Sequence, residues 1–178
     1  MLLLIFSSIA ARVKIAIPVN NKITPPVFII IDVYLLKVLE KNINLLINIP
    51  EIAEVAIKNN ISAIILTNTT NSNKDNLISK FKSEEGGLSG DPLHQISTNM
   101  IKKFYKELNS KIPIIGVGGV NSGKSAYEKI IAGASLLQLY TSFVYRGPTT
   151  AKDIKKELIQ ILKNEGIKNI KDAVGKVM

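Results

Sequence analysis

The chain has 178 residues, of which 46% are apolar, so it is long enough to form one domain with a sizeable core. It contains no cysteine, which excludes disulfide bonds and thiolate metal sites. The formal net charge is +9, but the basic residues are almost all lysines spread along the chain, and Arg12 and Arg146 are the only arginines. Without an arginine patch or interleaved aromatic residues, we expect no nucleic-acid partner.

The N-terminal segment 1–26 matches no clear pattern. Residues 1–9 are nearly all apolar, but they are too few for a membrane-spanning helix, which needs about 20 residues. No basic residue precedes this run, as it would in a secretory signal. We expect a buried or truncated helix here, with a weak membrane anchor or degenerate signal as the alternative. A separate domain is predicted over 27–178.

Four short, continuous apolar runs predict the strands of a parallel sheet. They span 27–31, 61–66, 112–117 and 135–140, and amphipathic helical patterns lie between them. Such runs are typical of strands buried on both faces, and alternating strands and helices imply right-handed parallel crossovers. This α/β pattern fits four units, or one half, of a (β/α)₈ TIM barrel, whose usual size is about 250 residues. Residues 32–49 fit poorly, and we expect an irregular helix there.

Local signals predict where several helices begin and end. Apolar residues recur at helical spacing over 96–108 and again over 154–162. Gly166 is placed to follow the end of the second of these helices. The sequence Ser125-Ala126-Tyr127-Glu128 predicts a capping box, and Gly133 is expected to end that helix.

One polar motif lies just before a long loop, and a glycine-rich motif lies near the end of that loop. Thr67-Asn68-Thr69-Thr70 directly follows a predicted strand, and an Asn amide can both donate to and accept from the edge of a polar ring. An ordinary Asx or Thr turn is the alternative. The polar stretch 71–92 is longer than most structureless loops and contains Gly86-Gly87-Leu88-Ser89-Gly90. Its glycines would allow close approach of backbone to a ligand, and a flexible linker is the alternative.

A glycine turn follows the third predicted strand. Gly116-Val117-Gly118-Gly119 leads towards a helix, where backbone amides and the helix dipole favour an anion. The third glycine of a dinucleotide fingerprint is missing, so the pattern gives little support to a Rossmann site. In barrels, phosphate sites are commonly built by the loops after the last two strands. We therefore predict a phosphate site between Gly118-Gly119 and Tyr140-Thr141. His94, the only histidine, is expected beside a helix cap at the surface rather than as a catalytic base.

Together these motifs resemble the dihydroorotate dehydrogenases of the membrane-associated class 2. The resemblance is specific over about 52–176 and covers the C-terminal half of the family's barrel. It implies FMN-dependent oxidation of dihydroorotate to orotate in de novo pyrimidine biosynthesis, with electrons passed to a quinone. It also implies peripheral association with the inner membrane, whereas a fragment on its own would be cytoplasmic. The motifs that carry it are 67–70, 86–90, 97–98, 113–119, 132–135, 138–141, 147–148 and 170–175.

The resemblance also implies roles for individual residues. By motif match, Thr67 would contact FMN, Asn68 and Thr69 would contact the orotate ring, and Gly90, Gly119, Tyr140 and Thr141 would hold the flavin and its phosphate. No metal ligand is implied.

The chain departs from the family pattern near its beginning. Ile30 occupies the position of the family's FMN-contacting lysine, and Asp32-Val33-Tyr34-Leu35 replaces an acidic segment that contains proline. The serine base and the quinone-binding N-terminal helices have no counterpart. We therefore expect no catalytic residue in this chain, and a truncated form that is inactive alone.

Two other functions are compatible with the same residues. One is a non-catalytic FMN- or phosphate-binding half barrel, either a relic or a split subunit completed by a chain that supplies the first half of the barrel. The other is a different FMN or sugar-phosphate barrel enzyme.

Overall fold

The computed structural model describes residues 28–30, 49–71, 74 and 77–176. Within them, four strands form one sheet in the order β1-β2-β3-β4, and every neighbouring pair is parallel. The predicted parallel fold with alternating helices is therefore confirmed. Strands β2, β3 and β4 are shorter than their predicted apolar runs, because residues at the ends of these runs lie outside the ladder. The strands are β1 (Phe28–Ile30), β2 (Ala63–Ile65), β3 (Ile114–Gly116) and β4 (Ala134–Leu137).

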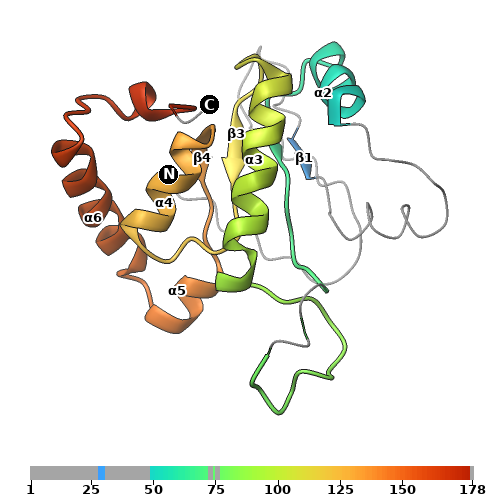
Figure 1. The fold of residues 1–178 in the computed structure, drawn as a ribbon, viewed down its shortest axis with the longest axis vertical. Coiled ribbons are helices and arrows are strands. Elements are labelled where there is room, and N and C mark those ends of the chain that lie inside the picture. Colours follow the sequence, from blue (N-terminus) through green and yellow to red (C-terminus); the bar gives the residue numbers. More distant parts are fainter. Residues whose placement is uncertain (1–27, 31–48, 72–73, 75–76, 177–178) are drawn as a thin grey trace, which may run out of the picture.

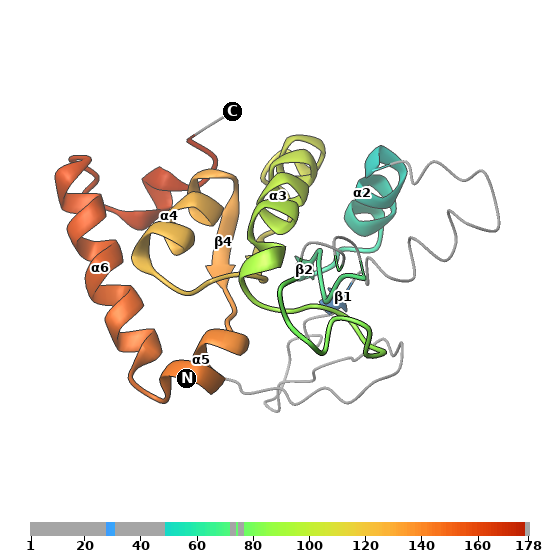
Figure 2. The same ribbon diagram turned by 60° about the horizontal axis from the view of Figure 1, so that its bottom comes forward.

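The helices lie along one side of this sheet. Figures 1 and 2 show α2, α3 and α4 in a row in front of the strands, with α6 outside α4. A short helix, α5, follows β4 and leads into α6. The helical elements are α2 (Ile49–Lys58), η2 (Asp91–Leu93), α3 (His94–Leu108), α4 (Gly123–Ile131), α5 (Thr141–Arg146), α6 (Thr150–Asn164) and η3 (Ile170–Ala173).

Two apolar clusters hold the helices in place. In the first, Phe104 and Leu108 of α3 pack with Ile64 of β2 and Ile114 of β3, and each of the four side chains is at most 1% exposed. Residues 101, 104 and 108 lie on one face of α3 because the helix repeats every 3.6 residues. The second cluster joins α4 to α6 and includes Ala126, Ile130, Ile154, Leu158 and Ala173. Burial of these faces fixes the ends of the strands relative to the helices.

The beginning of α4 differs from the prediction. Its N-cap is Ser122, whose hydroxyl accepts from the Ser125 amide at 3.2 Å, while the Ser125 hydroxyl accepts from the Ser122 amide at 3.0 Å. The predicted capping box beginning at Ser125 is therefore wrong by one turn, because the short Ser125 side chain serves as the N3 acceptor in place of Glu or Gln. The predicted helix ends are confirmed, since Gly133 and Gly166 follow α4 and α6 with φ of +123° and +67°.

Several expectations fall on residues outside the described part of the chain. These are the apolar N-terminal run within 1–26 and the irregular helix over 32–48. Ile49 is described, and it begins α2. Ile30 ends strand β1. No helix among the described residues has the length and apolarity needed to cross a membrane.

Candidate functional site

The loops after β2, β3 and β4 leave the same edge of the sheet. All three strands are parallel neighbours, so their carboxyl ends meet at one edge, which we call the rim. The Gln138 amide donates to the Gly116 carbonyl at 2.9 Å and continues the β3–β4 contact up to that edge. Thr67, the Gly118-Gly119 turn and Tyr140-Thr141 are therefore all placed at the rim, as the sequence predicted.

The glycine-rich segment 86–90 returns to the rim from the long connection. Thr70 and Leu88 exchange two backbone hydrogen bonds of 3.0 and 2.7 Å, which tie the segment to the end of β2. Its other end contacts α5, because the Thr141 hydroxyl donates to the Ser89 hydroxyl at 3.0 Å. A Cβ atom on Gly90, whose φ is +81°, would lie 3.0 Å from the Thr141 methyl carbon. Three motifs that are distant in sequence thus meet at one place.

The Gly118-Gly119 turn lies directly against the start of α3. Both residues have positive φ, +99° and +70°. A Cβ atom on Gly119 would lie 2.6 Å from the His94 Cβ atom and 2.7 Å from its Cα atom, so no larger residue fits without a shift of backbone. The amides of the two glycines form no hydrogen bond within the described part of the chain. The turn therefore offers two donors beside the beginning of α4.

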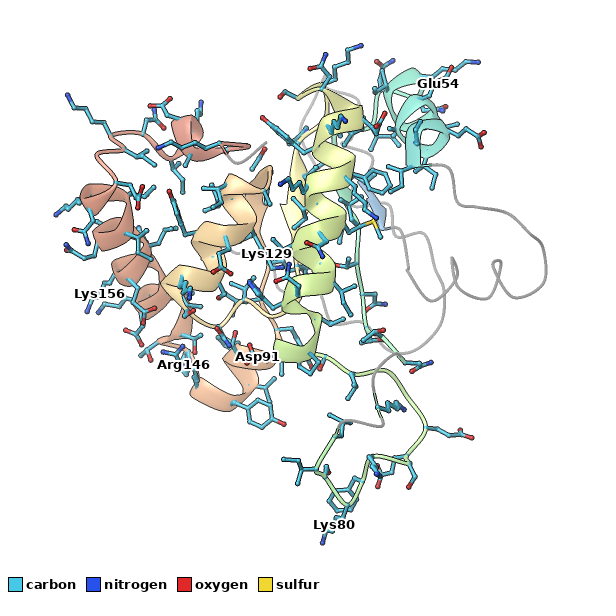
Figure 3. The ribbon with its side chains drawn as sticks, viewed as in Figure 1. Glu54, Lys80, Asp91, Lys129, Arg146 and Lys156 are labelled. Atoms are coloured by element: carbon cyan, nitrogen blue, oxygen red, sulfur yellow. The ribbon has the colours of Figure 1, made fainter. Side chains whose placement is uncertain are left out.

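The end of this turn is held by side chains from α5 and η2 and by the side chain of Asn121. The Ser142 hydroxyl donates to the Val120 carbonyl at 2.6 Å. The Asn121 side-chain amide donates to the Asp91 carboxylate at 2.6 Å, and the Arg146 guanidinium donates to the Asn121 carbonyl. Figure 3 shows Asp91 and Arg146 at the same end of the molecule. These bonds connect the loops after β3 and β4, so the conformation of the turn is fixed without a ligand.

Behind the rim lies a buried polar network. The Thr67 hydroxyl, on a residue only 4% exposed, lies 3.0 Å from the Val117 carbonyl and 3.3 Å from the Ser97 hydroxyl. Ser97 also donates to the Val117 carbonyl and accepts from the Lys129 ammonium at 3.0 Å. Burial lowers the pKa of Lys129 from 10.5 to about 8, and neighbouring Glu128 opposes this shift. Figure 3 shows Lys129 between α4 and α3.

Lys129 has no predicted role from the sequence. The helical repeat contained a signal, because Lys129 lies three residues after buried Ala126 and therefore on the inward side of α4. Ser97 likewise shares the buried face of α3 with Ile101 and Phe104.

His94 begins α3, beside the cap as predicted, but its side chain is only partly exposed. Its Nε2 atom lies 2.5 Å from a carboxylate oxygen of Glu128, and its side chain is 20% exposed. The ring is partly covered because α3 packs against α4. The Nδ1 atom is buried and has no partner among the described residues. With Nε2 engaged by Glu128, His94 is not placed as a base at the rim.

The remaining predicted residues differ in exposure. Tyr140 is 58% exposed, Asn68 is exposed, and Thr69 is partly buried. A Cβ atom on Gly87 would lie 2.2 Å from the Thr69 hydroxyl, so the glycine-rich segment lies against this threonine. The proximity of Thr67, Gly90, Gly119 and Thr141 is thus a property of the fold, while their roles towards a ligand stay predictions. Among the described residues, no acidic, histidine or cysteine group is arranged to hold a metal ion.

Comparisons with known proteins agree with this geometry. The family model of dihydroorotate dehydrogenase matches residues 8–162. The chain belongs to the dihydroorotate dehydrogenase family. It is 47% identical over 126 residues to the mitochondrial dihydroorotate dehydrogenase (quinone) of Arabidopsis thaliana, covering 70% of this chain and 27% of that protein. It is 48% identical over 125 residues to the mitochondrial enzyme of Mus musculus, covering 70% of this chain and 32% of that protein.

A solved structure shows the same architecture. The crystal structure of ligand-free DHODH from Eimeria tenella matches with a TM-score of 0.69 and 44% sequence identity. The match covers 72% of this chain and 35% of that one. The chain thus spans about a third of the length of the relatives that it matches, and the described sheet is part of a dihydroorotate dehydrogenase TIM barrel.

Proposed function

We propose that the rim binds FMN and one edge of orotate, and that the chain serves in the oxidation of dihydroorotate to orotate by a quinone-dependent dihydroorotate dehydrogenase. The observation that carries the proposal is the convergence of Gly90, Gly118-Gly119 and Thr141 at the carboxyl ends of parallel strands. Because the chain belongs to the dihydroorotate dehydrogenase family, we interpret this convergence as a flavin-binding site.

The residues at the rim fit a phosphate group. The amides of Gly118 and Gly119 form no hydrogen bond within the described residues, and α5 begins at Thr141 with first-turn amides that have no partner inside the helix. Arg146 adds a positive charge one helical turn further on. Such amides and charges favour an anion. We propose that they hold the FMN phosphate.

Neighbouring side chains suit the flavin ring and the substrate. Thr67 lies at the end of β2, where its hydroxyl is fixed by the Val117 carbonyl, and we assign it to the flavin. Asn68 and Thr69 follow it, and an amide beside a hydroxyl matches the alternating donors and acceptors of the orotate ring. Gly90 and Tyr140 would complete the flavin contact.

Oxidation of dihydroorotate removes a hydride and a proton. When bound, FMN would accept the hydride, and a base within hydrogen-bond distance must take the proton. His94 is bound to Glu128 and Lys129 is buried, so neither of these two groups is placed to do so. We propose that the first half of the barrel supplies the base, either in the same protein or as a separate chain. Electron transfer to a quinone and peripheral association with a membrane would also depend on that part.

Binding of FMN and of riboflavin to the 178-residue chain tests the phosphate site. The two ligands share the flavin ring, but only FMN carries the phosphate, and each hydrogen bond to a charged group contributes about 1.5–3 kcal/mol. Fluorescence titration should therefore give at least about tenfold tighter binding for FMN. Equal affinities would contradict the phosphate site, and no binding of either ligand would contradict the flavin assignment.

A second experiment tests the substrate. Orotate should raise the melting temperature of the FMN-bound chain, whereas benzoate, a carboxylate without the ring amides, should not. Loss of the orotate effect in Asn68→Ala would support the substrate assignment. An equal rise with both compounds would favour a different flavin or phosphate barrel.

A further inference from the structure

The long connection between β2 and η2 carries a projecting tip. Figure 1 shows this loop, in green, extending away from the sheet and the helices, and Figure 3 shows Lys80 at its far end. We call residues 77–82 the tip. Within it the Ile78 side chain is fully exposed and the Phe81 side chain is 58% exposed. Two large apolar side chains therefore lie in water beside Lys80.

Hydrogen bonds give the tip a defined shape. The Lys82 amide donates to the Ser79 carbonyl at 3.2 Å, and the Phe81 amide donates to the Ser79 hydroxyl at 3.1 Å, so the chain turns tightly here. The Lys74 ammonium donates to the Glu84 carbonyl at 2.8 Å and joins the two limbs of the loop. The apolar side chains are thus presented outwards on a structured turn.

Lysines flank the apolar side chains of the tip. Lys80 and Lys82 are exposed on either side of Phe81 in the sequence, and the Lys80 ammonium lies 5.0 Å from the centre of the Phe81 ring. The tip contains no acidic residue, and Glu84 and Glu85 follow it on the limb that returns to the sheet. The whole chain has a formal net charge of +9, which attracts it to a negatively charged surface at long range.

This combination fits the surface of an anionic lipid bilayer. Apolar and aromatic side chains can enter the boundary between headgroups and acyl chains, while long lysine side chains extend back to the lipid phosphates. Each lysine near an anionic membrane strengthens binding about fivefold. A protein partner fits less well, because a stable interface needs about 800 Å² from each side and two apolar side chains on a narrow loop offer much less.

We propose that the tip is a lipid-contacting surface, which inserts Ile78 and Phe81 into the headgroup region of an anionic membrane and places Lys80 and Lys82 on the lipid phosphates. This contact goes beyond the proposed function, since it needs neither FMN nor the first half of the barrel. The loop is tied to the end of β2 by the bonds between Thr70 and Leu88, so a membrane-bound tip keeps the rim near the membrane surface.

A fluorescent reporter at the tip tests the insertion. The chain contains no tryptophan, so Phe81→Trp introduces a single one. With ligand-free protein and vesicles of equal parts phosphatidylserine and phosphatidylcholine, its emission should shift to shorter wavelength and become protected from acrylamide. Val55→Trp is the matched control, since Val55 is 56% exposed on α2 and should report no change. An unchanged emission of Phe81→Trp, or an equal shift in Val55→Trp, would overturn the proposal.

Paired lysine variants separate the tip from the net charge. In cosedimentation with the same vesicles, Lys80→Gln with Lys82→Gln should weaken binding at least about tenfold. Lys155→Gln with Lys156→Gln removes the same charge from the exposed face of α6 and should stay within about twofold of the wild type. Equal losses in the two pairs, or no binding by the wild type, would refute the role of the tip.

The apolar contribution is measured in the same assay. Ile78→Ser with Phe81→Ser should weaken binding at least about tenfold, because the apolar area that enters the membrane is lost. Unchanged binding would contradict insertion. These measurements need no FMN, so absence of FMN binding would refute the proposed function, and the vesicle results would still decide on the tip.

Discussion

Replacement of Gly119 by alanine should destabilise the chain through a backbone contact. Gly119 has φ of +70°, and an added Cβ atom would lie 2.6–2.8 Å from the Cβ, Cα and N atoms of His94. The left-handed conformation costs a residue with a Cβ atom about 1–2 kcal/mol. Forced overpacking adds about 1–3 kcal/mol, because the start of α3 cannot move as a flexible side chain would. We therefore expect a loss of about 2–5 kcal/mol in the free energy of unfolding.

Gly166→Ala is the matched control for this experiment. Gly166 has φ of +67°, but nothing lies within 4 Å of its added Cβ atom. Only the conformational cost of about 1–2 kcal/mol should remain. Urea unfolding followed by circular dichroism measures both variants. If Gly119→Ala and Gly166→Ala lose the same stability, the contact between the turn and α3 is not present in solution, and the argument that only glycine fits there is refuted.

Four further predictions follow from the core, the helix cap, the buried ammonium and the missing base. Phe104→Ala should cost about 3–5 kcal/mol, whereas Phe81→Ala, at a position 58% exposed, should change the stability by less than about 0.5 kcal/mol in urea unfolding. Ser122→Ala should cost about 1 kcal/mol by removing the N-cap of α4, with exposed Ser110→Ala as the comparison. Because the pKa of Lys129 is lowered to about 8 in the folded chain, the unfolded chain binds more protons between pH 8 and 10.5. The free energy of unfolding of the wild type should therefore rise with pH relative to that of Lys129→Met across this window, by about 3 kcal/mol at most. A difference in stability between the two proteins that stays constant with pH would contradict the burial of a charged Lys129. The 178-residue chain with FMN and a quinone should not oxidise dihydroorotate, and steady-state turnover without a partner chain would show that the base lies within it.

The architecture of the described part of the chain was largely predictable from the sequence. Continuous apolar runs predicted the parallel strands, because strands buried on both faces show no alternation. The glycine and threonine motifs predicted which loops gather at the rim, since parallel strands present their carboxyl ends together. The boundaries were less accurate. The sequence predicts the cap at Ser125, whereas Ser122 is the N-cap of α4, because several serines near a helix start can serve either role.

The tertiary contacts behind the rim were not predictable in the same way. Nothing in the local sequence shows that Lys129 on α4 would reach Ser97 and Thr98 on α3, because that contact depends on how the two helices pack. The contact of His94 with Glu128 was not predictable for the same reason, since the two residues lie 34 positions apart in the sequence. Sequence patterns showed which residues face inward, and the structure was needed to show which of these polar groups meet.

The location of the ligand site is tested most directly by an NMR titration of the ¹⁵N-labelled chain with FMN. If the rim holds the FMN phosphate, the amide signals of Gly118, Gly119 and Thr141 should shift first and saturate together at one dissociation constant. Amides of α6, such as those of Ile159 and Gln160, should stay in place. FMN-dependent shifts confined to α6 or to other surfaces, with Gly118, Gly119 and Thr141 unchanged, would contradict the account.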